Sequence, residues 1–148
     1  MKVLIASDHA GFELKNDLSA FLSEKRYGVD DFGPSAFNSA DDYPDFVSKV
    51  ARAVSESTEE VRGIIIGGSG EGEAMVANRF PNVRAAVYYG GALDIVRLSR
   101  EHNDANVLAL GARFVSPEEA RAAVDLWLNT PFSHDERHAR RIKKIERN

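Results

Sequence analysis

Short apolar runs alternate with helical patterns along the whole chain, and this alternation restricts the fold more than any other feature. The apolar runs predict strands at Val3–Ala6, Tyr27–Phe32, Gly63–Ile66, Arg84–Tyr89 and Asn106–Leu110. Each is followed by apolar residues at helical spacing, such as Leu14, Leu18 and Leu22 after the first. Strands that alternate with helices form parallel sheets. We therefore expect a doubly wound, Rossmann-like α/β fold, with a five-stranded parallel sheet and helices on both faces.

The later helices follow the same rule. We expect them at Pro44–Ser57, Glu73–Arg79, around Leu93–Leu98, after Ser116–Pro117 and at Asp135–Glu146. Ser116 is a typical N-cap and Pro117 suits the first helical position. The last helix has few apolar residues, which favours a C-terminal helical arm over a core helix.

Composition limits the class of protein. A chain of 148 residues with 43% hydrophobic and 28% charged residues is ordinary for one globular domain, here residues 1–148. It has no cysteine, which excludes disulfides, zinc–thiolate sites and thiol catalysis. No signal peptide precedes the first strand and no apolar run is long enough to span a membrane, so we expect no membrane partner and a cytoplasmic location.

Charge is distributed unevenly. The net charge is −4, yet His134–Asn148 contains six Lys/Arg against three Asp/Glu. A basic tail on an acidic body is one feature of nucleic-acid binders, but one short helix is a small footprint. We do not expect nucleic acid to be a partner.

The glycine-rich segment after the third predicted strand is the strongest functional signal. Gly67, Gly68, Gly70 and Gly72 lie close together, with Ser69, Glu71 and Glu73 among them and no lysine. A Walker A loop needs that lysine, and the spacing does not fit the dinucleotide motif G-x-G-x-x-G. Glycine N–H groups beside a carboxylate instead suit an oxygen that gains negative charge while a base removes a proton. The alternative is a tight turn with solvated glutamates.

Other polar residues follow the remaining strands, and in this fold sites form at the carboxyl ends of strands. Asp8 and His9 end the first strand, where they are either an acid/base pair or a helix cap with a packed histidine. Arg113 follows the fifth strand. His102 ends a helix, where an ordinary polar terminus is the alternative to a catalytic role.

The basic tail offers two kinds of site. Arg137 and Arg141 are one helical turn apart and could grip a phosphate. His134 and His138 are spaced for a metal on a neighbouring stripe, but no HExxH pattern or third ligand accompanies them. We expect no metal, and a solvated charged face is the alternative for the whole stripe.

Six segments in order resemble one family. They are SDHAG (7–11), DYPDF (42–46), GGSGEGEAMVANR (67–79), REHNDAN (100–106), GAR (111–113) and RHARR (137–141). Together these segments resemble ribose-5-phosphate isomerase type B and its relatives, the sugar-phosphate isomerases that include the galactose-6-phosphate enzymes. The resemblance covers nearly the whole chain.

The resemblance implies an aldose–ketose isomerase that moves a proton between C1 and C2 of a sugar phosphate through an enediolate, without a cofactor. Asp8 and His102 would open the sugar ring. Residues implied to bind substrate are His9, Tyr43, Gly68, Ser69, Gly70, Glu71, Gly72, Asn103, Arg113, Arg137 and Arg141. Among these, His9 and the three arginines would hold the phosphate, and Tyr43 would line the sugar pocket.

The base is where this chain departs from many relatives, which place a cysteine at the position of Gly67. A second branch uses a glutamate just after the glycine loop, and Glu73 stands there. Burial can raise the pKa of a carboxylate toward the working pH, as a general base requires. Glu71 is the nearest rival, but it lies between two glycines.

The resemblance also implies a homodimer or homotetramer with active sites shared between subunits. Either His102, Asn103 and Arg113 or the tail arginines would come from the partner. Ribose 5-phosphate and ribulose 5-phosphate of the pentose phosphate pathway are the expected substrates. The alternatives are another sugar phosphate (galactose 6-phosphate, allose 6-phosphate or a tetrose phosphate) and a sugar-phosphate binder without catalysis.

Overall fold

A computed structural model describes residues 1–146 of the chain as an α/β fold with one parallel sheet. The strands are β1 (Lys2–Ser7), β2 (Gly28–Asp31), β3 (Val61–Gly67), β4 (Ala85–Tyr88) and β5 (Val107–Gly111). The helices are α1 (Phe12–Glu24), α2 (Pro44–Glu56), α3 (Glu71–Ala77), α4 (Asp94–Glu101), α5 (Pro117–Asn129) and α6 (Glu136–Ile145). The predicted fold class is confirmed.

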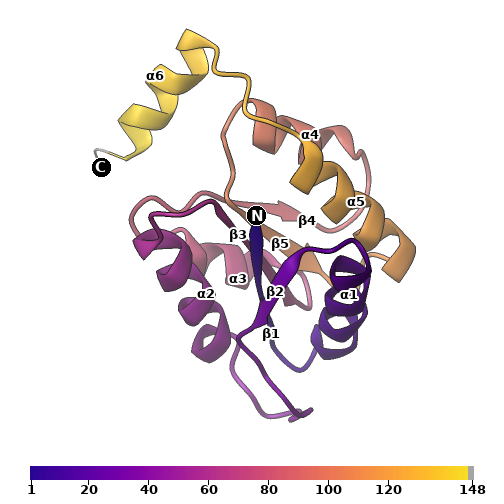
Figure 1. Cartoon of the computed structure of the whole chain (residues 1–148). Helices are drawn as coiled ribbons and strands as arrows, with labels where there is room; N and C mark the ends of the chain where they lie inside the picture. The colour runs from indigo at the N-terminus through magenta and orange to yellow at the C-terminus, as the bar shows by residue number, and fades with distance from the viewer. Residues whose placement is uncertain (147–148) are drawn as a thin grey trace.

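The sheet brings the three central strands to a common end. Its order is β2-β1-β3-β5-β4, and each neighbouring pair is parallel (Figure 1). Ser7 pairs with Ile66, and Gly67 pairs with Gly111. The loops after β1, β3 and β5 therefore leave the sheet at one edge and at one level.

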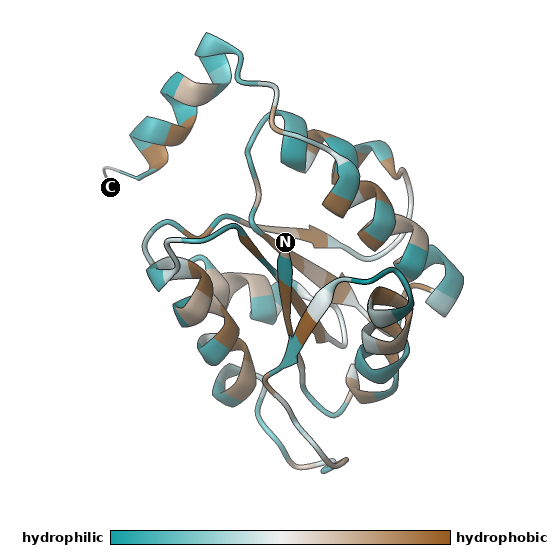
Figure 2. Ribbon diagram, in the orientation of Figure 1, coloured by the Kyte–Doolittle hydropathy of each residue, from teal (hydrophilic) through white to brown (hydrophobic). Residues whose placement is uncertain are grey.

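Two apolar layers cover the sheet. On one face, α1, α4 and α5 pack against β1, β3 and β5 through a cluster that includes Leu18, Val96 and Trp127. On the other face, α2 and α3 contribute Val50 and Ala74 to a second cluster. Figure 2 shows the apolar sides of these helices turned toward the sheet. Helices on both faces are what a buried parallel sheet requires.

Some element boundaries differ from the sequence expectation. The helix α3 begins at Glu71, two residues before the predicted start, because Gly70 takes a left-handed conformation (φ 82°) that ends the loop at once. On α4, Leu93 and Ile95 are exposed although the apolar pattern runs through them. Both lie beside the edge strand β4, where no further strand of the described chain covers them.

An ion pair between a buried lysine and a partly exposed aspartate anchors the long segment between β2 and α2. Lys15 on α1 is only 1% exposed and donates a hydrogen bond to Asp31 at the end of β2. The other oxygen of Asp31 accepts from the N–H of Gly33 at 2.8 Å. The position of residues 32–43 relative to the sheet therefore depends on the contact between the buried ammonium group of Lys15 and Asp31.

The last helix, α6, extends beyond the edge at which the strands begin (Figure 1). The connection to it is held by a hydrogen bond from Ser133 N–H to the carbonyl of Glu101 at 3.1 Å. At its far end, Glu146 pairs with Arg84 at 2.7 Å. The predicted C-terminal arm is therefore present and is fixed to the body at both ends. Within residues 1–146, no helix has the length and apolar character needed to cross a membrane.

The Lys15–Asp31 pair leads to a stability prediction. Asp31→Asn should lower the free energy of unfolding by about 2–3 kcal/mol, because it leaves the buried ammonium without its charged partner. Lys15→Met should cost less than about 1 kcal/mol, and the double variant should recover most of the loss. Urea unfolding measures each value.

The matched control is Asp30→Asn, which removes the exposed Lys2–Asp30 pair and should change stability by less than about 0.5 kcal/mol. An equal loss in Asp31→Asn and Asp30→Asn would contradict the anchoring role of the buried pair.

Candidate active site

The carboxylate of Glu73 lies directly over the end of β3. The residue is 3% exposed, and its Oε1 lies 1.7 Å from the position that a Cβ on Gly67 would occupy. Real atoms never approach so closely, so the carboxylate fits only because residue 67 has no side chain. Glu71, the rival carboxylate, is exposed at the start of α3. The structure thus buries the carboxylate of Glu73 against β3 and leaves that of Glu71 exposed.

Burial raises the pKa of Glu73 above its ordinary value, because the charged form loses hydration. The negative charge of nearby Asp8 adds to this effect, and a hydrogen bond from the backbone opposes it in part. A carboxylate that is harder to ionise is a stronger base once ionised, which suits proton abstraction near neutral pH.

The loop before Glu73 exposes backbone donors. Within residues 1–146, no hydrogen bond is formed by the N–H groups of Gly68, Ser69, Gly70 or Gly72. The hydroxyl of Ser69 accepts from the N–H of Glu71 at 3.3 Å, which holds the turn. The predicted set of free glycine donors beside a carboxylate is present.

Asp8 accepts a hydrogen bond at the start of the following helix, which fits one of the two alternatives drawn from the sequence, and it also lies near Glu73. Its Oδ1 accepts from the N–H of Gly11 at 3.1 Å, so it does help to begin α1. It is also buried (6% exposed) and close enough to Glu73 to affect the pKa of that residue. Its N–H donates to the carbonyl of Ile66 at 3.2 Å, which continues the ladder past the end of β1.

His9 is held by a residue that the sequence did not single out. Asp41 accepts one hydrogen bond from the His9 N–H at 2.9 Å and another from Nδ1 at 2.7 Å. The ring of Phe37 packs edge-on to the imidazole with a centroid distance of 6.4 Å. The only available signal for Asp41 was its place just before Tyr43, in a loop rich in polar residues.

Two further predicted residues line the same edge. The hydroxyl of Tyr43 lies 2.7 Å from the position of a Cβ on Gly72, so the phenol covers that part of the loop. The guanidinium of Arg113 lies 3.2 Å from the position of a Cβ on Gly68, and the backbone N–H of Arg113 donates to the Gly68 carbonyl at 3.1 Å. Tyr43 thus covers one side of the glycine loop, and Arg113 adds a positive charge beside it.

The remaining predicted residues lie at the opposite end of the strands, where the strands begin. His102 and Asn103 follow α4, next to the start of β4, where the carbonyl of Asn103 accepts from Arg84 Nε at 3.1 Å. Arg137 and Arg141 are exposed one turn apart on α6. The expected grouping of Arg113 with His102 and Asn103 is wrong for one chain, because Arg113 lies at the glycine loop.

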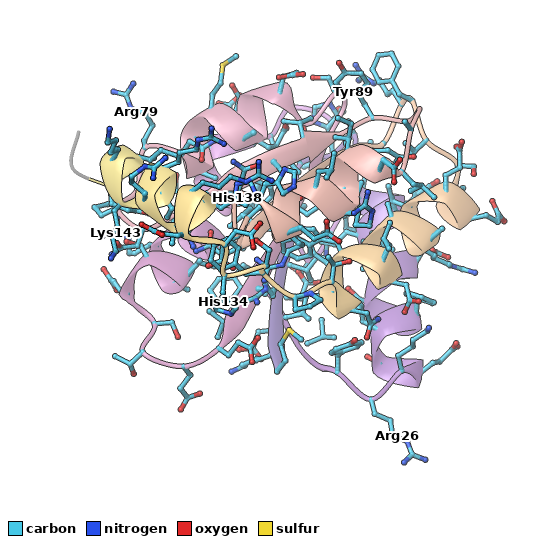
Figure 3. All side chains as sticks on the ribbon, turned by 90° about the horizontal axis from the view of Figure 1, so that it is seen from above. Arg26, Arg79, Tyr89, His134, His138 and Lys143 are labelled. Atoms are coloured by element: carbon cyan, nitrogen blue, oxygen red, sulfur yellow. The ribbon has the colours of Figure 1, made fainter. Side chains whose placement is uncertain are left out.

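A histidine stack joins this second group. The rings of His102 and His138 are 4.2 Å apart and nearly parallel. Figure 3 shows His138 on the side of α6 that faces the body of the molecule, and it is 4% exposed. Burial lowers the pKa of His138, and the neighbouring His102 and Arg137 lower it further. The stack therefore favours a neutral His138.

The structure contradicts a pairing of His134 with His138 on one helical face. His134 precedes α6 and has a φ of 58°, so it does not continue the helix, and it packs against Phe132 instead. The described residues contain one group with metal-ligand spacing, in which the ligand atoms of Asp8, His9 and Asp41 lie within 4.8 Å of one another. In that group, Nδ1 of His9 is already engaged with Asp41.

The arrangement divides the chemistry between two edges. One edge has a buried base, free N–H donors, a tyrosine and an arginine. The other has two arginines, an asparagine and a stacked histidine. The first can remove a proton and stabilise the resulting oxyanion, and the second can bind an anion.

The raised pKa of Glu73 leads to a prediction of stability against pH. Below about pH 4 the carboxyl is protonated in both folded and unfolded chains, so its burial does not lower the free energy of unfolding through ionisation. As pH rises, the unfolded chain ionises more readily than the folded one, so stability falls. Glu73→Gln should therefore raise the melting temperature at pH 7–8, and the gain should disappear near pH 4. The exposed Glu71→Gln is the control and should show no such trend; a pH-independent gain in Glu73→Gln would contradict the burial argument.

Comparison with known proteins agrees with this geometry. The model of the family described as Ribose/Galactose Isomerase matches residues 3–145. Ribose-5-phosphate isomerase B of Mycolicibacterium paratuberculosis is 39% identical over 143 residues, covering 96% of this chain and 87% of that protein. A probable ribose-5-phosphate isomerase B of Mycoplasma genitalium is 42% identical over 145 residues, covering 98% of this chain and 93% of that protein.

Solved structures are similarly close. The Mycoplasma genitalium ribose-5-phosphate isomerase B with bound ribulose 5-phosphate has a TM-score of 0.93 at 42% identity, covering 99% of this chain and 94% of that one. The Clostridium thermocellum ribose-5-phosphate isomerase B has a TM-score of 0.92 at 46% identity, covering 99% of this chain and 96% of that one.

Proposed function

This chain belongs to the ribose/galactose isomerase family, and we propose that it interconverts ribose 5-phosphate and ribulose 5-phosphate as an aldose–ketose isomerase. One observation carries the proposal: a buried carboxylate, Glu73, fills the space beside Gly67 next to a loop of free N–H donors. The names of the similar proteins supply the substrate. We place the reaction in the pentose phosphate pathway of the cytoplasm as part of the same proposal.

In the proposed mechanism, Glu73 removes the proton from C2 of the open-chain aldose. The electron pair of that C–H bond forms the C1–C2 double bond, and the carbonyl oxygen at C1 gains the negative charge. The N–H groups of Gly68, Ser69, Gly70 and Gly72 stabilise this oxygen, and each such donor contributes on the order of 10²-fold in rate. Glu73 then returns the proton to C1, while the proton of the C2 hydroxyl passes to the oxygen on C1, so that C2 becomes the ketone and C1 carries a hydroxyl.

Ring opening precedes this step. Asp8 and His102 are proposed to move the proton between the ring oxygen and the anomeric hydroxyl. Tyr43 and Glu71 face or adjoin the glycine loop and are proposed to bind the sugar hydroxyls. Asn103 is proposed to stabilise the enediolate from the other side of the substrate.

The proposed assembly is a homodimer with shared sites, alone or as half of a tetramer. Each site would combine Asp8, Glu73 and the glycine loop of one subunit with His102, Asn103 and the tail arginines of the other. Phosphate would lie between His9 and Arg113 of the first and Arg137 and Arg141 of the second. Support comes from the separation of the two groups within one chain and from the exposed apolar side chains near edge strand β4: Met75, Tyr89, Leu93, Ile95 and Phe114.

The reaction and its base can be tested in one experiment. In deuterated water, the protein with ribose 5-phosphate should form ribulose 5-phosphate and incorporate solvent deuterium at the exchanged carbon, as followed by NMR. Glu73→Gln should lower turnover by about 10²-fold or more, with little change in substrate affinity, because only the base is removed.

Near-normal turnover in Glu73→Gln would exclude Glu73 as the base. A second outcome is that the wild-type protein is inactive on ribose 5-phosphate but active on galactose 6-phosphate, allose 6-phosphate or a tetrose phosphate. That result would replace the proposed substrate and keep the proposed mechanism. Binding without turnover of any of these sugars would favour a non-catalytic binder.

The shared site can be tested by mixing defects. Glu73→Gln and the double variant Arg137→Ala/Arg141→Ala should each be nearly inactive as homodimers. Mixed dimers, isolated with two different affinity tags, should regain about half of the wild-type turnover, because one of their two sites is intact. If each site used residues of one chain only, the mixed dimers would stay inactive.

A further inference from the structure

In the loop between β2 and α2, one carboxylate oxygen accepts two hydrogen bonds from His9. Oδ1 of Asp41 accepts from the backbone N–H and from the ring Nδ1 of His9, at 2.9 and 2.7 Å. The two residues are 32 positions apart, and the side chain of Asp41 is 7% exposed. The contact therefore fixes both the main chain and the imidazole of His9 from outside its own segment.

This contact determines how the imidazole is presented. Because Nδ1 carries the hydrogen that Asp41 accepts, the other nitrogen, Nε2, is the one left for a ligand. Within residues 1–146, Nε2 of His9 forms no hydrogen bond, and the side chain is 30% exposed at the edge that carries the glycine loop. Phe37 packs edge-on to the ring and further restricts its rotation.

The burial of Asp41 against His9 costs stability, so tethering of the loop alone does not explain it. The second oxygen of Asp41, Oδ2, is buried and has no hydrogen-bond partner among the described residues. Burial of a half-satisfied carboxylate costs stability. The neighbouring Asp42 and Asp45 are exposed and carry no such cost. We therefore look for the role of Asp41 in its effect on His9.

We propose that Asp41 is a positioning residue for substrate binding: it holds the His9 imidazole in one orientation with a hydrogen on Nδ1, so that Nε2 faces the phosphate group of the sugar phosphate. In the complex the ring carries hydrogens on both nitrogens, Nδ1–H donates to Asp41, and Nε2–H donates to a phosphate oxygen. The inference rests on the proposed function for the identity of the ligand. It adds a residue that belongs to none of the segments shared with the isomerases.

The test measures phosphate binding and not only turnover. Calorimetry with inorganic phosphate and with ribose 5-phosphate should show that Asp41→Ala weakens both by about tenfold, as is typical when the partner of a ligand-binding histidine is removed. Asp41→Asn keeps an oxygen that can accept both hydrogen bonds and should restore most of the affinity. Asp45→Asn, which changes an exposed carboxylate in the first turn of α2, is the control and should bind like the wild type.

A double-variant cycle separates positioning from loop folding. In a His9→Ala background, Asp41→Ala should cause no further loss of phosphate affinity, because its effect passes through the imidazole. The imidazole nitrogen NMR signals of His9 should show hydrogen on Nδ1 in the wild-type protein and a mixture of tautomers in Asp41→Ala. In steady-state assays, Asp41→Ala should raise KM and leave kcat nearly unchanged.

A full tenfold loss in the His9→Ala background, or an unchanged tautomer in Asp41→Ala, would overturn the inference and make Asp41 a structural tether. Because phosphate binding needs no turnover, these results are independent of the isomerase assay. A protein that isomerises no sugar phosphate but still binds phosphate through His9 and Asp41 would refute the proposed function and support this inference.

Discussion

The site depends on the common level at which β1, β3 and β5 end. Hydrogen bonds continue the ladder beyond the strands, from Asp8 N–H to Ile66 and from Ala112 N–H to Gly67. The three loops are therefore fixed to one another by backbone and not by their side chains. A displacement of one strand by a single residue would turn every side chain of that strand to the other face of the sheet. The groups proposed for the proton chemistry thus lie at loops that backbone hydrogen bonds tie together.

The buried carboxylates and the arginines lie at different places around the sheet, and this division fits the charges of the proposed substrate. Asp8 and Glu73 are buried at the carboxyl ends of the strands, where their negative charge disfavours a phosphate beside the proposed base, and Arg113 at the same edge is proposed to bind the phosphate together with His9. The far edge and α6 hold Arg137 and Arg141, which attract phosphate. A substrate with a phosphate at one end and a carbonyl at the other is oriented by these charges before any specific contact forms.

Features local in sequence were predictable, and features formed by distant segments were not. Asp8, Glu73 and Arg113 lie within six residues of the ends of β1, β3 and β5, so the parallel fold alone places them at one edge. The contact between His9 and Asp41 arises from a loop without periodic pattern, which no local rule could locate. The expected histidine pair failed at His134 because a left-handed residue there separates it from α6. The early start of α3 likewise depends on the φ of Gly70, which composition does not reveal.

The absence of a side chain at Gly67 has an evolutionary consequence. A cysteine at this position, as the resemblance implies for many related enzymes, would need the space that the Glu73 carboxylate fills. Introducing the thiol first would place it against the carboxylate, and removing the carboxylate first would leave no base. With Glu73 as the proposed base, an exchange of the carboxylate for a thiol therefore requires changes at positions 67 and 73 together. The carboxylate version has a proton-transfer group that oxidants and thiol-alkylating agents do not inactivate.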